Sequence, residues 1–460
     1  MRSRRDEVQA HAYMVGRLTS ALVHGEPDAP ESPLRRTGLG SFGGLLLGTL
    51  VVAGFLVWGL IFPSSNAAAL APGQVVIVKE TGSRYIYAHS ELRPVLNWSS
   101  ALLLTGGNPK MTALPAGALN GIPHGQSVGI VGAPDTLPAA AALNRGSWLV
   151  CALPGSRHQV AVTIGIPTLT SPLPAGDATV VRVGAEQYLV WHGQRLRLDA
   201  PWILQALGLG RAPVIGVGPV WLNAVPVGPD LTPVTVPGVG SQGPVLGSLH
   251  TRVGQVLTQQ NVGSPTEYYI VVAGGVAPIT STQAAIALSD PASAAADRGA
   301  PVAPVMVSPA AMAHAPIVHR TLADETDAPL APPRDDSGVA GVPCMDYQGA
   351  GGHAPALVFA PAPAGAQPPA GLPGVTGSPQ NASLIGVAPD GGALVRPQAA
   401  PGVGGNSLYL VTDAGVKFPV PSASTLLALG YRVGRAATMP AALLGLLPTG
   451  PALDLAPMRG

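Results

Sequence analysis

The chain has 460 residues, a formal net charge of +1 and only 11% charged residues. A nucleic-acid-binding protein needs a basic stripe on its surface, and a chain with so balanced a charge and just three lysines does not provide one. The 59 glycines and 50 prolines approach a low-complexity composition, yet a hydrophobic share of 47% leaves material for a core. The length allows two or three ordinary domains.

Residues 1–38 form a short head that contains one amphipathic helix. Ser3 and Asp6 resemble an N-terminal capping signal, and Gly25 is typical of the position just after a helix C-terminus. The apolar side of the helix consists of residues spaced three or four apart, namely Val8, Ala12, Val15, Leu18 and Leu22. A lone amphipathic helix needs a partner, and the few basic residues on its polar face favour another subunit over the membrane surface.

Residues 39–62 carry no charge and predict a transmembrane helix. These 24 residues extend roughly 36 Å as a helix, which is enough to cross a hydrocarbon core. A cleaved signal peptide is the alternative, since residues 67–69 are small alanines, but the segment is too long and begins too late for one. Arg35 and Arg36 flank the span, whereas no basic residue follows it until Lys79, so the positive-inside rule places the head in the cytoplasm.

Within the span, Gly40, Gly44 and Gly48 lie four residues apart and form one smooth stripe. Such a stripe lets a second helix approach closely, so the three glycines are candidates for a helix-packing face. The alternative is the ordinary glycine content of a glycine-rich chain.

Three stretches of the outer part share one pattern, a strand, a turn, a second strand and a short helix rich in Leu and Ala. They begin at Tyr85, Tyr188 and Tyr409. Each ends in a Pro-x-Gly motif 38 or 39 residues after its tyrosine, at Pro123-His124-Gly125, Pro226-Val227-Gly228 and Pro448-Thr449-Gly450. A degenerate copy begins at Tyr268 and reaches Ala- and Pro-rich sequence before any clear Pro-x-Gly ending. Units this small must pack on one another or on a common domain.

This organisation predicts an α+β protein with a short cytoplasmic helix, one transmembrane helix and an outer module of repeats around a central domain. Residues 354–379 are expected to be a flexible or extended connection because they are rich in Pro, Ala and Gly. The expected segments are the head at 1–38, the span at 39–62, the first repeat at 63–137, the central domain at 138–180 and 310–383, the second repeat at 181–245, the third at 246–309 and the fourth at 384–460.

The two cysteines, Cys151 and Cys344, both fall in the part expected outside the membrane. In an oxidising compartment an isolated pair is more often a disulfide than a zinc site, because zinc needs four ligands and no His or Cys lies at ligand spacing. Two unrelated buried thiols are the alternative. A bridge would close a loop of about 190 residues and contribute up to roughly 5 kcal/mol in the chain-entropy model.

No motif of an enzyme is convincing. None of the three lysines stands in a Gly-Lys-Ser/Thr loop, which nucleotide binding of the Walker type requires. The G-x-S-x-G string at residues 125–129 has a Pro-x-Gly turn before Ser127 and a strand-like stretch after it, unlike a nucleophile elbow. His314 and His319 form the only close histidine pair of the outer part and lie in Ala/Pro-rich sequence without a helix face to hold a metal. We therefore expect no catalytic, cofactor-binding or metal-binding residues.

The order and spacing of several blocks resemble the EccB family, the single-pass membrane core component of the type VII (ESX) secretion systems of actinobacteria. The matching blocks are the head "RRDEVQAHAYMVGRLTSALVHGEPDAPESPLRR", the span, "YLVWHGQRLRL", "WLNAVPVGPDLTPVTVPGVG", the cysteine pair, "LYLVTDAGVKFPVPSASTLLALGY" and "LLGLLPTGPALD". The resemblance covers nearly the whole chain. The blurred third repeat and the Ala/Pro-rich segments around it depart from the family pattern.

The resemblance implies a structural scaffold in the inner membrane, with an elongated periplasmic part of four repeats flanking a central domain. It implies as partners an EccC-type motor ATPase, EccD, EccE, the mycosin protease and further EccB copies, with the N-terminal helix docked on cytoplasmic parts of its neighbours. It also implies that Cys151 and Cys344 form the family's disulfide. Some family members are labelled ATPases, but the absence of a nucleotide-binding motif predicts that this chain alone does not hydrolyse ATP.

A membrane-anchored peptidoglycan-binding protein without a role in secretion is the alternative function. Sugar-binding grooves need only a few aromatic side chains, and the outer part offers Trp98, Trp191, Trp202 and Trp221. These tryptophans are more simply core residues of the small repeats. A cell-wall hydrolase is less favoured, because the sequence contains no positioned acid/base pair and no Cys/His nucleophilic set.

Overall fold

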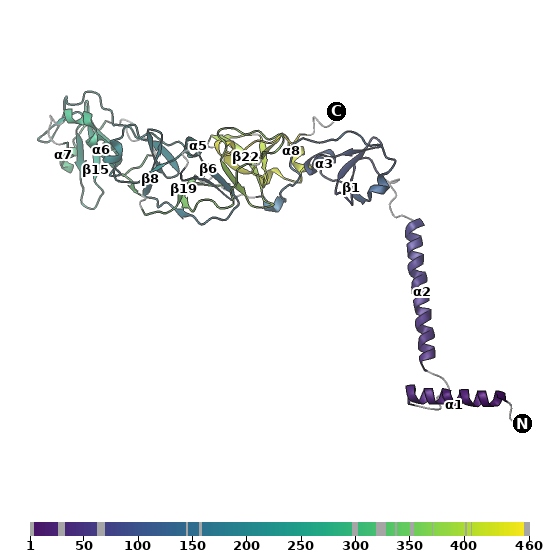
Figure 1. Cartoon of the computed structure of the whole chain (residues 1–460). Helices are drawn as coiled ribbons and strands as arrows, with labels where there is room; N and C mark the ends of the chain where they lie inside the picture. Colours follow the sequence, from purple (N-terminus) through teal and green to yellow (C-terminus); the bar gives the residue numbers. More distant parts are fainter. Residues whose placement is uncertain are drawn as a thin grey trace. The chain divides into compact units, whose positions relative to one another are not determined.

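The structure is a computed structural model (Figure 1). It describes residues 4–25, 33–61, 70–143, 146–155, 159–296, 302–318, 328–335, 338–349, 354–369, 371–400, 403–405 and 407–454. Ser3, the alanines at 67–69 and His319 lie outside these ranges. The chain divides into two units, Met1–Leu70 with Leu114–Gly121 and Ala71–Ala113 with Ile122–Gly460, and each is described by itself.

The first unit contains two long helices, α1 (Arg4–His24) and α2 (Pro33–Ile61). Asp6 and Glu7 lie in the first turn of α1, where carboxylates interact favourably with the helix dipole. Helix α2 begins at a proline, a residue whose fixed φ suits the first helical position. Its apolar part, Thr37–Gly59, is long enough to cross a membrane by length and composition, and none of it is buried against the rest of the chain.

The second unit contains four repeats with one topology, in which four strands form a sheet and a short helix lies between the third and fourth strands. The first repeat has β1 (Gln74–Val78), β2 (Arg84–Ala88), β3 (Glu91–Pro94), α3 (Trp98–Leu104) and β4 (Met111–Leu114). The second has β8 (Asp177–Val183), β9 (Glu186–Trp191), β10 (Gln194–Arg197), α4 (Ile203–Ala206) and β11 (Val214–Gly216). The third has β14 (Val256–Gln259), β15 (Glu267–Val272), β16 (Gly275–Ile279), α6 (Ser281–Ser289) and β17 (Val305–Met306). The fourth has β22 (Ala393–Ala400), β24 (Leu408–Val411), β25 (Lys417–Val420), α8 (Ala423–Ala428) and β26 (Ala437–Pro440).

The sheets run in the order β3-β2-β1-β4, β10-β9-β8-β11 and β16-β15-β14-β17, and the fourth repeats this order as β25-β24-β22-β26. The middle strands are antiparallel, whereas β11, β17 and β26 run parallel to the first strands of their repeats. The hairpin and helix that the sequence pattern predicted are therefore the centre of a larger unit. The outer parallel strand was missed because it spans only two to four residues, too few to establish a period.

The third repeat is complete. Its helix α6 carries a full capping box, in which the Thr280 side chain accepts from the Gln283 N–H and the Gln283 side chain accepts from the Thr280 N–H. Asn97 caps α3 and Ser422 caps α8 with one bond each, in which the side-chain oxygen accepts from the backbone N–H three residues later. The third repeat is thus as regular as the others in its hairpin and helix, and its degeneracy is confined to the sequence of its ending.

The central domain is a six-stranded sheet in the order β21-β6-β5-β19-β20-β7. Its strands are β5 (Ser147–Ala152), β6 (Val160–Ile164), β7 (Ser171–Pro172), β19 (Val342–Gln348), β20 (Ala356–Ala360) and β21 (Leu384–Val387). Strand β20 lies inside the run 354–379 that composition predicted to be a flexible or extended connection and not a folded element. That expectation is wrong for β20, because the apolar stretch Leu357–Ala360 is buried and pairs with β19.

The strands shift several expected segment boundaries. Strand β8 starts at Asp177, before the expected start of the second repeat at residue 181. Strand β21 belongs to the central sheet, although it begins at residue 384 where the fourth repeat was expected. The hairpin β12 (Gln242–Leu246) and β13 (Leu249–Arg252) crosses the expected boundary at 245 and packs on β15 and β16 of the third repeat. The remaining α-helices are α5 (Pro219–Ala224), α7 (Pro309–Met312) and α9 (Ala441–Gly445). Two short strands, β18 (Arg334–Asp335) and β23 (Val403–Gly404), pair with β8 and β22.

Buried clusters join neighbouring parts of the second unit. Leu103 of α3 packs with Leu426 of α8, which joins the first repeat to the fourth. Ile286 of α6 packs among the core side chains of the second repeat and joins the third repeat to it. The largest cluster combines the central sheet with α5 and α9, so that the second and fourth repeats share the central domain's core. Figure 1 shows the same neighbours, with α6 beside β8 and α8 beside α3.

Candidate interaction surfaces

Helix α1 exposes the face that the sequence predicted as a partner-binding surface. Val8, Leu18 and Leu22 have exposed fractions of 67%, 62% and 81%, and Ala12 and Val15 are exposed as well. Burying one such side chain against another protein contributes about 1.5–3 kcal/mol. Met14, at the edge of this face, and Tyr13, on the opposite side of the helix, are exposed as well.

Helix α2 keeps its glycine stripe open. A side chain at Gly40, Gly44 or Gly48 would meet no described atom within 4 Å, so the stripe is free to receive another helix. The opposite side of α2, at 100° per residue, carries a shallow apolar groove lined by Phe42, Leu45, Leu46, Thr49, Leu50 and Ala53. The packing role of the glycines stays a prediction.

The two cysteines meet in the centre of the second unit. Cys151 on β5 and Cys344 on β19 face each other in the antiparallel ladder and are joined by a disulfide. Both are completely buried, together with Val358 of β20. The second and third repeats lie between β7 and β19 in the chain, so the bridge ties together the two ends of this insertion.

Helix α5 of the second repeat is clamped to the central sheet beside the disulfide. The Trp221 indole N–H donates to the Val150 carbonyl at 2.9 Å, and the Tyr347 hydroxyl donates to the Ala224 carbonyl. Burial raises the pKa of Tyr347 above its ordinary value, while the charge of Arg195 opposes the rise. The tyrosine bond satisfies the carbonyl at the end of α5, and the two bonds together fix α5 on the central domain.

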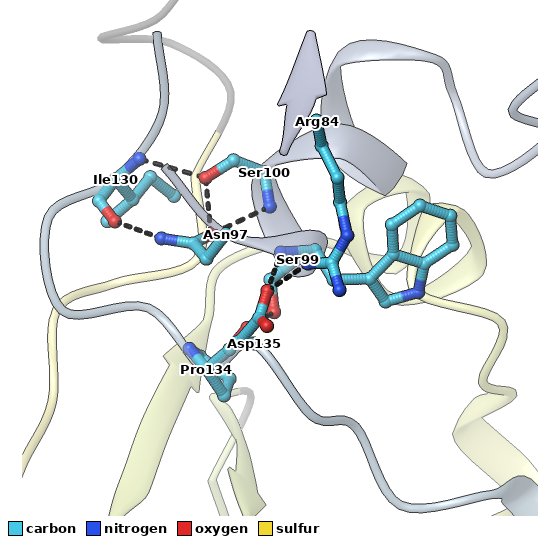
Figure 2. Close-up of polar contacts among 8 residues, drawn as sticks. Arg84, Asn97, Ser99, Ser100, Ile130, Pro134 and Asp135 are labelled. Carbon is cyan, nitrogen blue, oxygen red and sulfur yellow. Dashed lines mark hydrogen bonds and ion pairs between the residues drawn. The ribbon is translucent and has the colours of Figure 1, made fainter. Parts of the chain in front are cut away.

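The first repeat holds the segment after its Pro-x-Gly motif with a polar network (Figure 2). The Asn97 side chain accepts from the Ser100 N–H at 3.0 Å and donates to the Ile130 carbonyl at 2.7 Å. The Ser100 hydroxyl accepts from the Ile130 N–H, and the Ser99 hydroxyl donates to the Pro134 carbonyl. Asn97 and both serines are buried, so these side chains cannot bond to water instead, and the network holds residues 130 and 134 in place.

The other side of this network is exposed. The Asp135 carboxylate accepts from the Trp98 N–H at the start of α3 and pairs with Arg84 of β2. The Arg84 guanidinium also lies over the Trp98 ring, 5.7 Å from its centre. Trp98 is therefore occupied by an intramolecular contact.

The tryptophans proposed for sugar stacking do not form one platform. Trp221 is fully buried in the central core, and Trp98 is covered by Arg84. Trp191 stacks on His192 with ring centres 3.7 Å apart, and Trp202 packs against the core of the second repeat. Trp98, Trp191 and Trp202 thus make contacts within their own repeats, and Trp221 belongs to the core shared with the central sheet.

The described residues form no nucleophile elbow and no metal-binding cluster. Ser127 lies in an extended segment between bridges at His124 and Val128, so it is not on a strand-to-helix elbow. Among the described residues, no three His, Cys, Asp or Glu side chains gather where they could hold a metal ion. A hollow of about 270 Å³ lies between Asp230–Thr235 and the start of α6. Beside it the Leu330 carbonyl accepts from the Ser281 N–H, so this N–H at the start of α6 is bonded within the chain.

The Pro-x-Gly motifs share one backbone arrangement, which we call the closing motif. In the second repeat, Arg195 of β10 donates its N–H to the Pro226 carbonyl and accepts from the Gly228 N–H, at 2.8 and 2.9 Å. Leu92 makes the same two bonds with residues 123 and 125, and Lys417 makes them with residues 448 and 450. The closing motif therefore adds an outer parallel strand beside the hairpin of its repeat.

The third repeat has a closing motif that the sequence pattern could not reveal, Pro316-Ile317-Val318. Val276 of β16 donates to the Pro316 carbonyl and accepts from the Val318 N–H, both at 2.9 Å. The glycine has moved to the facing strand, where a side chain on Gly275 would overlap Pro316 and Val318. The motif also lies 48 residues after Tyr268, about ten later than in the other repeats.

The sequence model of a family described as "Type VII secretion system ESX-1, transport TM domain B" matches residues 2–457. The chain belongs to this EccB family. The resemblance predicted from the sequence is confirmed over its full extent, including the α+β class with one apolar N-terminal helix followed by a sheet-rich module.

Two EccB relatives illustrate the sequence similarity. The "ESX-5 secretion system ATPase EccB5" of Mycobacterium marinum is 30% identical over 347 residues, which cover 71% of this chain and 66% of the relative. The "ESX-3 secretion system ATPase EccB3" of Mycolicibacterium smegmatis is 28% identical over 298 residues, 61% of this chain and 56% of the relative. The aligned regions span 66% and 56% of the length of these two relatives, less than two thirds of each.

Solved structures of EccB proteins have the same fold. A chain of an intact ESX-5 inner membrane complex is 25% identical, with a TM-score of 0.66 over 100% of this chain and 95% of that chain. A chain of the periplasmic assembly of the ESX-5 inner membrane complex gives a TM-score of 0.67 over 86% of this chain. An EccB3 dimer from the ESX-3 core complex gives 0.65 over 84%.

Proposed function

We propose that the chain is a structural, membrane-anchored scaffold subunit of a type VII secretion complex. The observation that carries the proposal is the full-length likeness to a chain of an intact ESX-5 inner membrane complex, together with the family match over residues 2–457. The exposed apolar face of α1 and the disulfide-bonded, closely packed repeats suit a protein that holds other subunits together.

The proposed partners are an EccC-type ATPase, EccD, EccE, the mycosin protease and further EccB copies. Helix α1 supports a cytoplasmic subunit as a partner, because its exposed apolar residues have no cover in the described part of the chain. Copies of the chain itself are supported by the EccB3 dimer among the similar structures.

The proposed orientation places α1 in the cytoplasm and the repeats in the periplasm. Arg35 and Arg36 at the start of α2 support it through the positive-inside rule. A cysteine introduced at Val262, which is fully exposed in a loop of the third repeat, should react with a membrane-impermeant maleimide in intact cells. A cysteine at Ala10 should react only after lysis, and the reverse pattern would contradict the orientation.

We also propose that the chain alone does not hydrolyse ATP, although its relatives carry the word ATPase in their names. Lys417 supports this reading, because its ammonium donates to the Leu444 carbonyl at the end of α9 and its burial lowers its pKa. A structural lysine of this kind is not available to a phosphate. Hydrolysis measured with the purified chain should equal that of a Lys417→Met variant and of buffer.

The deciding experiment is extraction of the tagged chain from its own membranes in mild detergent, followed by native sizing and mass spectrometry. We expect a megadalton-scale particle that contains an FtsK/SpoIIIE-like ATPase and a many-spanning membrane protein. A free monomer or dimer would refute the scaffold proposal in favour of the peptidoglycan-binding alternative, which binding to purified cell wall would then test.

A further inference from the structure

The closing motif of the fourth repeat is covered on its outer edge. The Thr376 N–H donates to the Thr449 carbonyl at 2.8 Å, and the Thr449 N–H donates to the Thr376 carbonyl at 3.0 Å. The two residues form an antiparallel bridge. The covering segment, residues 372–378, belongs to the run that composition predicted to be a flexible or extended connection, and Val375 packs against the core shared by the first and fourth repeats.

The second repeat has the same motif with the same spacing of prolines. Pro226-Val227-Gly228-Pro229 corresponds to Pro448-Thr449-Gly450-Pro451, and the inner edges make equivalent bonds to Arg195 and Lys417. The outer edge differs. The N–H and C=O of Val227 have no partner among the residues that the structure describes, and the side chain is 70% exposed.

The equivalent positions of the first and third repeats differ from Val227. His124 of the first repeat stacks on Tyr85, with ring centres 5.6 Å apart, and Ile317 of the third repeat has an exposed fraction of 47%. An exposed β-branched apolar residue with free backbone groups on a sheet edge is a template for pairing with another strand. The occupied copy of the motif in the same chain gives the chemistry of the strand that fits.

We propose that the outer edge of Val227 docks an extended segment of a partner protein, antiparallel, as Thr449 docks Thr376. The segment is uncharged and has a small or β-branched residue opposite Val227, with glycine and proline nearby as in Leu372-Pro373-Gly374-Val375-Thr376-Gly377. On the same edge the Val225 N–H is already bonded to the Leu222 carbonyl and Pro229 has no N–H, so the edge offers one hydrogen-bonded residue pair and no continuous ladder. The edge therefore suits a short docked segment and not a long added strand.

Disulfide trapping tests the proposal on the full-length chain in detergent. A Val227→Cys variant is incubated at graded β-mercaptoethanol with the peptide LPGVCGS, in which cysteine replaces the residue equivalent to Thr376 and carries β-mercaptoethanol as a mixed disulfide. Attack by the thiolate introduced at position 227 forms the protein–peptide disulfide and releases one β-mercaptoethanol. Directly opposed residues of a hydrogen-bonded antiparallel pair lie about 5.5 Å apart, within the reach of a disulfide. Val262→Cys, at an exposed loop position, is the matched control, and the two native cysteines are bonded and buried.

We expect the V227C chain to retain the peptide at about tenfold higher reductant than the V262C chain. Methylation of the peptide nitrogen at its cysteine should abolish this difference, because the N–H that bonds the Val227 carbonyl is then missing. Equal retention at both positions, or no effect of the methyl group, would overturn the proposal. Preferential disulfide dimers of the V227C chain would overturn it in favour of a second copy as occupant. None of these outcomes depends on the role in secretion.

Discussion

Gly450 shows how a single residue limits a closing motif. A side chain at this position would overlap the ring of Phe418, which is 1% exposed and cannot move aside. The same crowding occurs at Gly228 against Gln194 and at Gly275 against Val318. A glycine is thus favoured on one strand or the other, and the third repeat has it on the opposite strand.

We expect Gly450→Ala to lower the stability of the fourth repeat by about 1–3 kcal/mol, because the added methyl overpacks a buried aromatic core. Gly434→Ala is the control, since a side chain there meets no described atom within 4 Å. Thermal unfolding followed by circular dichroism of both variants would measure the difference. Equal midpoints would show that Phe418 relaxes freely and that the steric argument fails.

Tyr347 makes stability depend on alkaline pH. Its raised pKa means that the neutral phenol is favoured in the folded state, while the unfolded chain ionises near pH 10. Its contribution is therefore complete below pH 10 and is lost as the pH rises through the folded pKa. We expect Tyr347→Phe to cost about 1–2 kcal/mol at pH 7, because the Ala224 carbonyl loses a buried donor.

The same variant should also show a shallower loss of stability between pH 10 and 11, measured by urea unfolding in each buffer. Tyr431 also has a raised pKa from burial, so the pH dependence should decrease without disappearing. A variant as pH-sensitive as the parent chain would assign the effect to Tyr431, Tyr188 and Tyr269, whose pKa values burial also raises.

At the scale of elements, α1 is defined by its sequence and completed by a partner. The matched pair Ala12→Glu and Ala10→Glu places the same charge on the apolar face and on the opposite side of the helix. We expect Ala12→Glu to reduce recovery of the large particle at least tenfold, because an unpaired carboxylate would be buried at the interface. Ala10→Glu should leave recovery unchanged.

Both α1 variants should remain in the membrane fraction, because α2, the one helix of the described residues long and apolar enough to cross a membrane, is unchanged in them. Recovery is measured by native sizing after extraction in mild detergent. Similar loss for the two variants would mean that α1 is destabilised as a helix or that it binds through another face.

At the scale of the whole molecule, the disulfide closes the central domain around an inserted pair of repeats. Replacing both Cys151 and Cys344 by alanine should lower the free energy of unfolding by up to about 5 kcal/mol, since the bridge closes a loop of 193 residues. The β5–β19 ladder remains to hold the fold together in this variant. Urea unfolding of the double variant, compared with the parent chain in the absence of reductant, would test this.

A stability loss near zero would show that the ladder and the clamps at Trp221 and Tyr347 already restrain the insertion. Limited proteolysis provides the control, because cleavage in the double variant should begin between β18 (Arg334–Asp335) and β19 and not within the first repeat.

The sequence by itself determined the membrane helix, the N-terminal amphipathic helix and the hairpin-helix centre of the repeats. These depend on local period, caps and charge, which are properties of neighbouring residues in the chain. The family resemblance added the likeness to EccB proteins, which the match over residues 2–457 confirms.

Only the tertiary structure decided the four-stranded topology, the fold of the run around β20 and Thr376, and the closing motif at Pro316-Ile317-Val318. In each case a short extended segment pairs with a strand far away in the sequence. Two to five residues have no detectable period, and composition describes a proline-rich segment but not the edge that it covers. The glycine of the third closing motif could not be found for the same reason. Val318 stands where the other motifs have glycine, and Gly275 on the facing strand leaves the space instead, so the close approach depends on both strands together.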